Sequence, residues 1–173
     1  MSFASKLKDM VAGLFDWPRH MLEGDTKISR EWREKVDVKA ATDFSMPTLT
    51  PRLVLQLFGT EVVRKGFHDD FWIILLKRAI EALPDGSKVV ITDVRFPNEA
   101  KCLEQTFGAK MFRVMRGPLP EWWDTAVHNP EAMPTEFPKV HQSEWAVAGV
   151  TATVIDNNGT IPDLHNKIKT LML

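Results

Sequence analysis

The spacing of apolar residues along the chain predicts helices that alternate with short strands. Phe3, Leu7, Val11 and Leu14 recur at intervals of three and four, which is typical of an amphipathic helix over residues 3–15. Short apolar runs rich in β-branched residues indicate buried strands instead. We therefore expect further helices at 51–65, 70–83, 98–107 and 161–173, and strands at 89–91, 110–116 and 149–155. The first two strands and the helix between them predict a right-handed parallel βαβ unit, and hence an α/β fold.

The stretch from Lys88 to Ala100, KVVITDVRFPNEA, joins a predicted strand to polar residues at its carboxyl end. In open α/β sheets, ligands bind at that end of the strands. Asp93 and Arg95 therefore have two interpretations. Either the Asp93 carboxylate contacts a metal ion or a hydroxyl group while the Arg95 guanidinium contacts a phosphate, or the two side chains form an ion pair that fixes a turn.

The predicted helix at 51–65 carries polar residues on one face. Thr50 is its expected N-cap, and a proline occupies the first helical position, where the missing N–H costs nothing. Arg52, Gln56 and Arg64 follow at intervals of four and eight, so we expect them on adjacent parts of one face. This face either binds the phosphate and base of a nucleotide or is an ordinary solvated surface.

The segment at about 117–146 is rich in proline and tryptophan and ends in His141-Gln142-Ser143-Glu144. It is too long, and too often interrupted by proline, to be a tight connection between strands. We expect it to be a lid or an insertion. Because the chain has no repeat and no linker-like stretch, residues 1–173 are expected to form a single domain.

Composition narrows the class of protein further. A formal net charge of -1 gives no basic field, so neither nucleic acid nor an anionic membrane surface is an expected partner. Cys102 is the single cysteine, which excludes a disulfide framework and fits a reducing compartment. No apolar run approaches the roughly 20 residues of a membrane span, and the first residues lack the apolar core of a signal peptide. We therefore expect a cytoplasmic protein.

Residue patterns argue against several kinds of catalytic site. The five histidines show no metal-ligand spacing and the sequence has no HExxH, so we expect no metal site built from protein ligands alone. No GxSxG turn is present to carry a nucleophilic serine. The phosphate-binding P-loop, GxxxxGK[S/T], is also absent from these 173 residues.

Several segments taken together nevertheless resemble the bacteriophage deoxynucleoside monophosphate (dNMP) kinases. They are FASKLKDMVAGLF at 3–15, TPRLVLQLFGTEVVRKGFHDDFW at 50–72, ITDVRFPNEA at 91–100, FRVMR at 112–116, HQSE at 141–144 and IDNNGTIPDL at 155–164. That family has a P-loop kinase fold and moves the terminal phosphoryl group of ATP, with magnesium, onto a dNMP. The resemblance implies a three-layer, P-loop-kinase-like parallel sheet flanked by helices.

The resemblance also implies roles for individual residues. The residues that would bind the acceptor nucleotide or belong to the segment closing over it are Arg52, Gln56, Arg64, Trp72, His141 and Glu144. The residues that would act at its sugar, phosphate or metal are Asp93, Arg95 and Arg116. The implied ligands are a dNMP and a nucleoside triphosphate donor, with magnesium bound alongside the nucleotide.

One departure from the family bears on both fold and function. Family members have a strand, a P-loop and a helix before the segment at 3–15, and the expected fold is reduced by their loss. The lost loop would carry the usual ATP site. The lost strand is central in the sheet, and an unfilled slot would leave backbone groups unpaired at about 1–3 kcal/mol each when buried. We therefore expect a homo-oligomer or a protein partner.

Two functions stay open on the sequence. The chain is either a dNMP kinase-like phosphotransferase with an atypical donor site, or a catalytically inactive kinase homologue. The inactive homologue would serve as a nucleotide-binding or protein-interaction factor.

Overall fold

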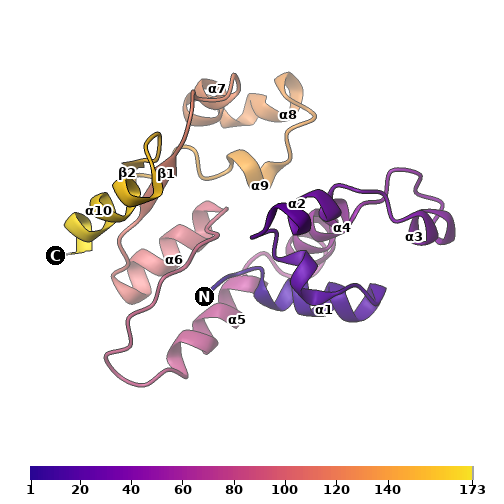
Figure 1. Ribbon diagram of the computed structural model, residues 1–173, viewed down its shortest axis with the longest axis horizontal. Coiled ribbons are helices and arrows are strands. Elements are labelled where there is room, and N and C mark those ends of the chain that lie inside the picture. Colours follow the sequence, from indigo (N-terminus) through magenta and orange to yellow (C-terminus); the bar gives the residue numbers. More distant parts are fainter. Residues whose placement is uncertain (173) are drawn as a thin grey trace. The chain divides into compact units, whose positions relative to one another are not determined.

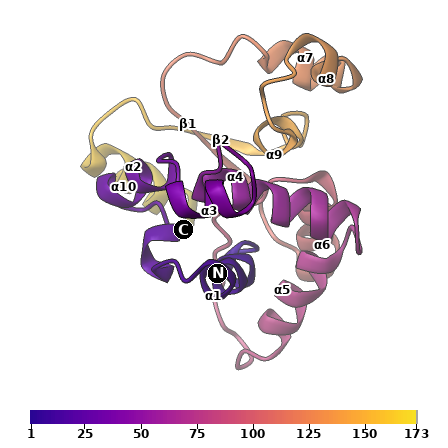
Figure 2. The same cartoon turned by 90° about the vertical axis from the view of Figure 1, so that its right-hand side faces the viewer.

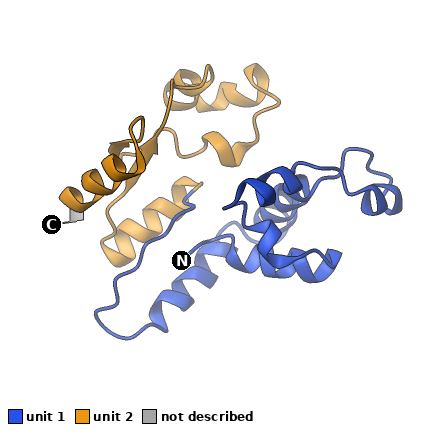
Figure 3. Ribbon diagram, in the orientation of Figure 1, with its two compact units in different colours: residues 1–94 blue, residues 95–173 orange. Residues whose placement is uncertain are grey.

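The computed structural model describes residues 1–172 as an α/β protein with many helices and a two-stranded parallel sheet (Figure 1). Residue contacts divide the chain into two compact units, Met1–Val94 and Arg95–Leu173 (Figure 3). Whether they act as one kinase-like domain stays a prediction. None of the helices in residues 1–172 has the length and hydropathy needed to span a bilayer.

All regular elements within the first unit are helices. Their bounds are α1 (Ser5–Phe15), η1 (Arg19–Leu22), α2 (Lys27–Arg33), α3 (Val38–Asp43), α4 (Pro51–Gln56), the π-helix η2 (Leu57–Lys65) and α5 (Phe71–Glu81). Leu7 and Val11 of α1 are buried, as their spacing predicted, whereas Leu14 of the same predicted stripe is 61% exposed. Trp72, Ile73 and Leu76 of α5 are also buried. The predicted helices at 3–15 and 70–83 are thus confirmed.

The helix predicted over 51–65 is present, with Thr50 as its N-cap and Gly66 after its end, but its winding changes after Gln56. From Leu57 onward the backbone bonds follow the wider i to i+5 spacing of a π-helix. A Cβ at Gly59 would lie only 2.8 Å from Leu7 Cδ2, so the glycine allows this segment to approach α1 closely. The Gly59 carbonyl also accepts a hydrogen bond of 2.9 Å from Trp72 Nε1. These contacts join the π-helix to α1 and α5.

Residues 89–91, predicted as a strand, have no regular secondary structure and do not belong to the sheet. The backbone contacts of this stretch within the first unit are with Met1: the terminal ammonium donates to the Val90 carbonyl (2.6 Å), and the Thr92 amide donates to the Met1 carbonyl (3.4 Å). A single residue cannot form a ladder, and the Val90 side chain is 58% exposed. The predicted strand, and the βαβ unit that it would begin, are therefore wrong.

The second unit contains the sheet. Its elements are α6 (Pro97–Phe107), β1 (Phe112–Met115), α7 (Trp123–His128), η3 (Pro130–Ala132), α8 (Met133–Glu136), α9 (Gln142–Trp145), β2 (Thr153–Asp156) and α10 (Ile161–Met172). β1 and β2 are parallel, with Phe112 opposite Thr153 and Met115 opposite Asp156. Gly108 ends α6 in the left-handed conformation, as expected of a C-cap glycine. The sheet has two strands rather than three, and the P-loop-kinase-like arrangement stays a prediction.

Residues 122–148 form what we call the helical lobe, which has a small apolar core of its own. Ala126, Met133 and Ala148 are buried at its centre, and Met133 has no exposed surface. The partly buried side chains around them are Trp122, Trp123, Val127, Phe137, Val140 and Trp145. Both views show α7 and α8 side by side (Figures 1 and 2). The proline-rich segment is therefore folded around these tryptophans, and its role as a lid stays a prediction.

Candidate functional site

Arg95 contacts the end of the helical lobe at the residues singled out in the sequence. Its Nη1 donates to the Ser143 carbonyl and to Glu144 Oε1, each at 3.2 Å. The Arg95 side chain is 49% exposed and that of Glu144 is 35% exposed. A cation and an anion therefore lie together at the surface, where a ligand could reach both.

The Arg95 backbone is fixed by Glu99, which sequence reasoning did not single out. Glu99 Oε2 accepts hydrogen bonds from the amides of Arg95 (2.7 Å) and Phe96 (3.1 Å), and the residue is only 3% exposed. A carboxylate at this position satisfies amides at the start of α6 and interacts favourably with the helix dipole. The sequence signal was available, since glutamate three residues after the N-cap is the capping-box position.

His141 belongs to the same surface through its place at the N-cap of α9. Its Nδ1 accepts a hydrogen bond from the Ser143 amide (3.2 Å) and lies 2.9 Å from Ser143 Oγ. The ring thereby helps to fix the turn that presents Ser143 and Glu144 to Arg95. The structure thus brings together three residues predicted from the sequence: Arg95, His141 and Glu144.

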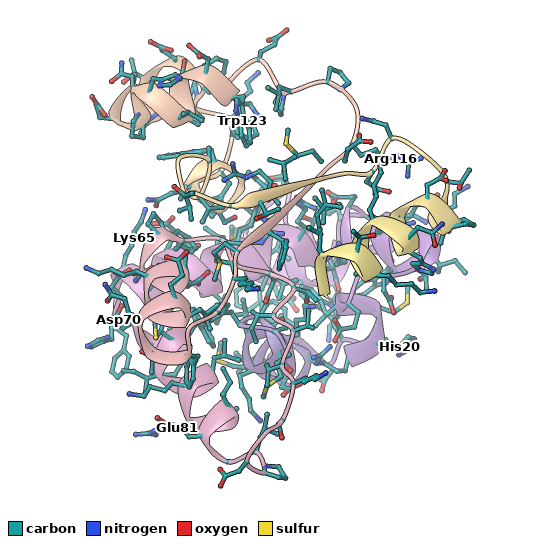
Figure 4. The ribbon with its side chains drawn as sticks, turned by 90° about the vertical axis from the view of Figure 1, so that its left-hand side faces the viewer. His20, Lys65, Asp70, Glu81, Arg116 and Trp123 are labelled. Atoms are coloured by element: carbon teal, nitrogen blue, oxygen red, sulfur yellow. The ribbon has the colours of Figure 1, made fainter. Side chains whose placement is uncertain are left out.

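Arg113 of β1 is a second residue that sequence reasoning missed. Its Nη2 donates to the carbonyls of Val147 (2.7 Å) and Val150 (3.0 Å), and its guanidinium lies 5.0 Å from the centre of the Trp123 ring. Burial lowers the pKa of this guanidinium below its ordinary value. Figure 4 shows Trp123 in the helical lobe. Arg113 therefore fastens the lobe and the residues after α9 to the sheet.

Arg116 lies at the carboxyl ends of the two strands. Because Met115 is opposite Asp156, the parallel register places Arg116 beside Asn157, and the Gly117 amide donates to Asn158 Oδ1 (2.7 Å). Figure 4 shows Arg116 at this edge, and its side chain is exposed. In α/β proteins, ligands bind at the carboxyl ends of the parallel strands. Arg116 is not among the partners recorded for Arg95, so the two predicted phosphate contacts are not linked directly.

An ion pair helps to fix the turn at this same edge. Lys167 Nζ donates to Asp156 Oδ2 at 2.6 Å, and this hydrogen bond holds the pKa of the Asp156 carboxyl below its ordinary value.

In the first unit, the carboxylate of Asp93 holds the start of α1. It accepts hydrogen bonds from Ser2 Oγ (2.6 Å) and from the amides of Phe3 and Ala4 (both 2.9 Å). Amides at the start of a helix have no carbonyl acceptor within the helix, and the Asp93 carboxylate supplies one. The contacts are structural, and a role for Asp93 at a nucleotide or metal stays a prediction.

The other candidate residues of the first unit do not share one exposed face. Arg52 Nη1 lies 3.3 Å from Glu34 Oε1 at the surface, and Gln56 follows one turn later on α4. Arg64 is only 4% exposed and donates to the Asp69 carbonyl (2.9 Å) and to its Oδ1 (3.3 Å). Trp72 is buried as well. Arg64 therefore does not lie on the exposed face that intervals of four and eight predicted.

Among residues 1–172, no group of three or more His, Cys, Asp or Glu side chains is arranged to hold a metal ion. Magnesium associated with a bound nucleotide stays a prediction.

Part of the chain is similar to a known protein. Over 58 residues it is 48% identical to the deoxynucleoside-5'-monophosphate kinase of Escherichia phage T5. The matched segment covers 34% of this chain and 23% of that kinase. No family model matches the chain, and no solved structure gives a significant match. The chain therefore contains a kinase-like region, and the resemblance to phage dNMP kinases is confirmed over that part.

Proposed function

We propose that this chain is a dNMP kinase-like protein of phage type that binds a dNMP at the Arg95–Glu144 surface of its second unit. The observation that carries the proposal is the 48% identity over 58 residues to a protein named as a dNMP kinase. The supporting geometry is the half-exposed Arg95 guanidinium, held between Glu99 on its backbone side and the residues from His141 to Glu144.

The chemistry of this surface suits a dNMP. The recorded hydrogen bonds of the Arg95 guanidinium within residues 1–172 use Nη1, so N–H groups on Nη2 and Nε can donate to phosphate oxygens. The Glu144 carboxylate is an acceptor and can take a hydrogen bond from a sugar hydroxyl. A dNMP carries both a phosphate and a 3′-hydroxyl group, which is what this pair of side chains would recognise.

Two modes of action fit such a site. In the first, the chain transfers a phosphoryl group from a nucleoside triphosphate to the bound dNMP, with magnesium on the nucleotide and positive charge from an atypical donor site or a neighbouring subunit. In the second, it binds the dNMP without turnover.

Calorimetric titration of the protein with each dNMP tests the binding site. We expect Arg95→Ala to weaken dNMP binding by about 1.5–3 kcal/mol, the contribution of hydrogen bonds to a charged group, which is roughly 10- to 150-fold in Kd. Lys101→Ala is the matched control, since Lys101 is an exposed cation on α6 and should leave the affinity unchanged. A folded Arg95→Ala variant with wild-type affinity would exclude this site.

A coupled assay for dNDP separates the two modes of action. Formation of dNDP from a dNMP, a nucleoside triphosphate and magnesium, and its loss on addition of EDTA, would establish phosphoryl transfer. Tight dNMP binding with no dNDP formed would establish the binding protein.

A further inference from the structure

One end of the Arg95 guanidinium is already engaged by acceptors of its own unit. Nη1 donates to the Ser143 carbonyl and to Glu144 Oε1, each at 3.2 Å, and all three residues belong to the second unit. The Glu144 backbone is held as well, because its amide donates to the His141 carbonyl (2.9 Å) at the start of α9. The carboxylate of Glu144 therefore adjoins the cation that would bind the phosphate of a dNMP.

A carboxylate next to Arg95 opposes the binding of a phosphate. Attraction and repulsion between charges depend on distance in the same way, so Glu144 cancels much of the attraction that Arg95 exerts on an anion. A phosphate monoester carries about 1.5 to 2 negative charges near pH 7. Because both side chains are only partly exposed, water and salt weaken its repulsion by Glu144 without removing it. A phosphate group alone is therefore a poor ligand for this pair of side chains.

A hydroxyl group on the same ligand changes this balance. An ionised carboxylate has only acceptor oxygens, and a hydrogen bond to it is roughly twice as strong as one between neutral groups. The 5′-phosphate and the 3′-hydroxyl of a nucleotide are joined through one sugar ring. The 3.2 Å hydrogen bond between Arg95 and Glu144 keeps their charged groups close enough for one such ligand to contact both. Donation by the hydroxyl to Glu144 would then offset the repulsion of the phosphate.

We propose that Glu144 determines the specificity of this site, by restricting it to nucleoside monophosphates that carry a 3′-hydroxyl group. The inference rests on the proposed binding of a dNMP at Arg95 and goes further in assigning substrate selection to Glu144. The charge of Glu144 disfavours inorganic phosphate and 2′,3′-dideoxynucleoside monophosphates, which have no 3′-hydroxyl to donate to it. A site that hydrogen-bonds a hydroxyl discriminates against the analogue lacking it, since the acceptor then loses that bond.

An NMR titration of the whole protein, followed at the Nε–H signal of Arg95, tests this proposal. The ligands are inorganic phosphate, each dNMP and the matching dideoxynucleoside monophosphate. We expect the unchanged protein to bind a dNMP on the order of tenfold more tightly than its dideoxy analogue, the effect of one hydrogen bond to a charged group. In Glu144→Gln, which is neutral but keeps an acceptor oxygen, this ratio should fall to about threefold or less. The same variant should bind inorganic phosphate more tightly than the unchanged protein does.

Two further variants sharpen the test. Glu144→Ala removes the charge and the acceptor together, so it should abolish the discrimination between a dNMP and its dideoxy analogue. Glu131→Gln is the matched control, because Glu131 is an exposed carboxylate of η3 in the helical lobe and its loss changes the net charge equally. It should leave the ratio of the two Kd values unchanged. Because each ratio compares two ligands on one protein, a partial loss of folded protein would not alter it.

Three results would overturn the inference, and they differ in what they mean for the proposed function. Equal affinity of the unchanged protein for a dNMP and its dideoxy analogue would leave dNMP binding in place but remove the selection. A ratio that is the same in Glu144→Gln and Glu144→Ala as in the unchanged protein would assign the selection to another residue. No change of the Arg95 signal with any dNMP would overturn the proposed function together with this inference.

Discussion

The candidate residues of the two units differ in how far their polar groups are already engaged. In the first unit, the Asp93 carboxylate accepts three hydrogen bonds at the start of α1, and the Arg64 guanidinium is buried against Asp69. In the second unit, Arg95 is half exposed and Arg116 is exposed. A charged residue in a family-like motif can therefore be engaged by the fold itself, as Asp93 and Arg64 are, while Arg95 and Arg116 keep exposed surface.

The largest effect on stability is expected for Asp93→Ala. Loss of the charged acceptor leaves Ser2 Oγ and the amides of Phe3 and Ala4 without it, so we expect the free energy of unfolding to fall by about 3 kcal/mol. Urea unfolding followed by circular dichroism measures this. Asp93→Asn, which keeps one acceptor oxygen, should cost less. Wild-type stability combined with weakened dNMP binding would instead make Asp93 a ligand-binding residue.

A smaller loss is expected for Arg64→Met. This change removes the buried hydrogen bonds to Asp69 while keeping an apolar side chain of similar length, and we expect it to cost about 2 kcal/mol in the same unfolding measurement. Lys65→Met is the matched control, since the Lys65 side chain is exposed and should change stability by less than about 0.5 kcal/mol. If Arg64→Met lowered nucleotide affinity without changing stability, Arg64 would belong with Arg95 rather than with Asp93.

Arg113→Ala should lower both the free energy of unfolding and the affinity for a dNMP, because this residue is partly buried and also supports the candidate site. Loss of the hydrogen bonds to the Val147 and Val150 carbonyls and of the contact with Trp123 should cost about 1–2 kcal/mol of unfolding free energy. Calorimetry should show a loss of dNMP affinity smaller than that of Arg95→Ala, since Arg113 acts by holding the lobe. An equal or larger loss would show direct contact with the nucleotide.

The smallest expected effect is a loss of stability in acid that both units share. Hydrogen bonds from the Ala40 amide and Trp17 Nε1 lower the pKa of Asp37, and the hydrogen bond from Lys167 lowers the pKa of Asp156, each from an ordinary value of 3.8. A carboxyl group whose pKa is lowered in the folded state stabilises the fold at any pH above its unfolded-state pKa. This stability is lost as the pH falls below 3.8 and through the lower folded-state pKa.

Amide exchange at several pH values distinguishes the two contributions. Lys167→Ala should flatten the acid sensitivity of α10 and leave that of α3 unchanged. Equal flattening in both helices would show that the acid sensitivity does not arise from these two carboxylates.

The sequence predicted those features of the fold that depend on interactions between residues close together in the chain. The bounds of α6 followed from Pro97 at its start and Gly108 at its end, because both act through their own backbone angles. The strand at 89–91 failed because a strand needs a ladder partner, and a β-branched run carries no information about whether one is present.

The candidate site shows the same division. Arg95 was predicted because it lies within the motif ITDVRFPNEA, and Glu99 occupies a capping-box position, which is itself a signal in the sequence. Arg113 was missed because its carbonyl partners, at Val147 and Val150, lie more than thirty residues along the chain. No pattern of side chains near residue 113 encodes those contacts.

The tryptophan-lined core of the helical lobe gives the protein a built-in optical probe. The sequence contains six tryptophans and no tyrosine, so ultraviolet emission comes almost wholly from indole rings. Trp122, Trp123 and Trp145 pack around Ala126, Met133 and Ala148 in the lobe, whereas Trp17, Trp32 and Trp72 belong to the first unit. Replacing those last three with phenylalanine would leave a chain whose fluorescence reports on the lobe alone, and the opening or closing of a lid would be visible without any attached dye.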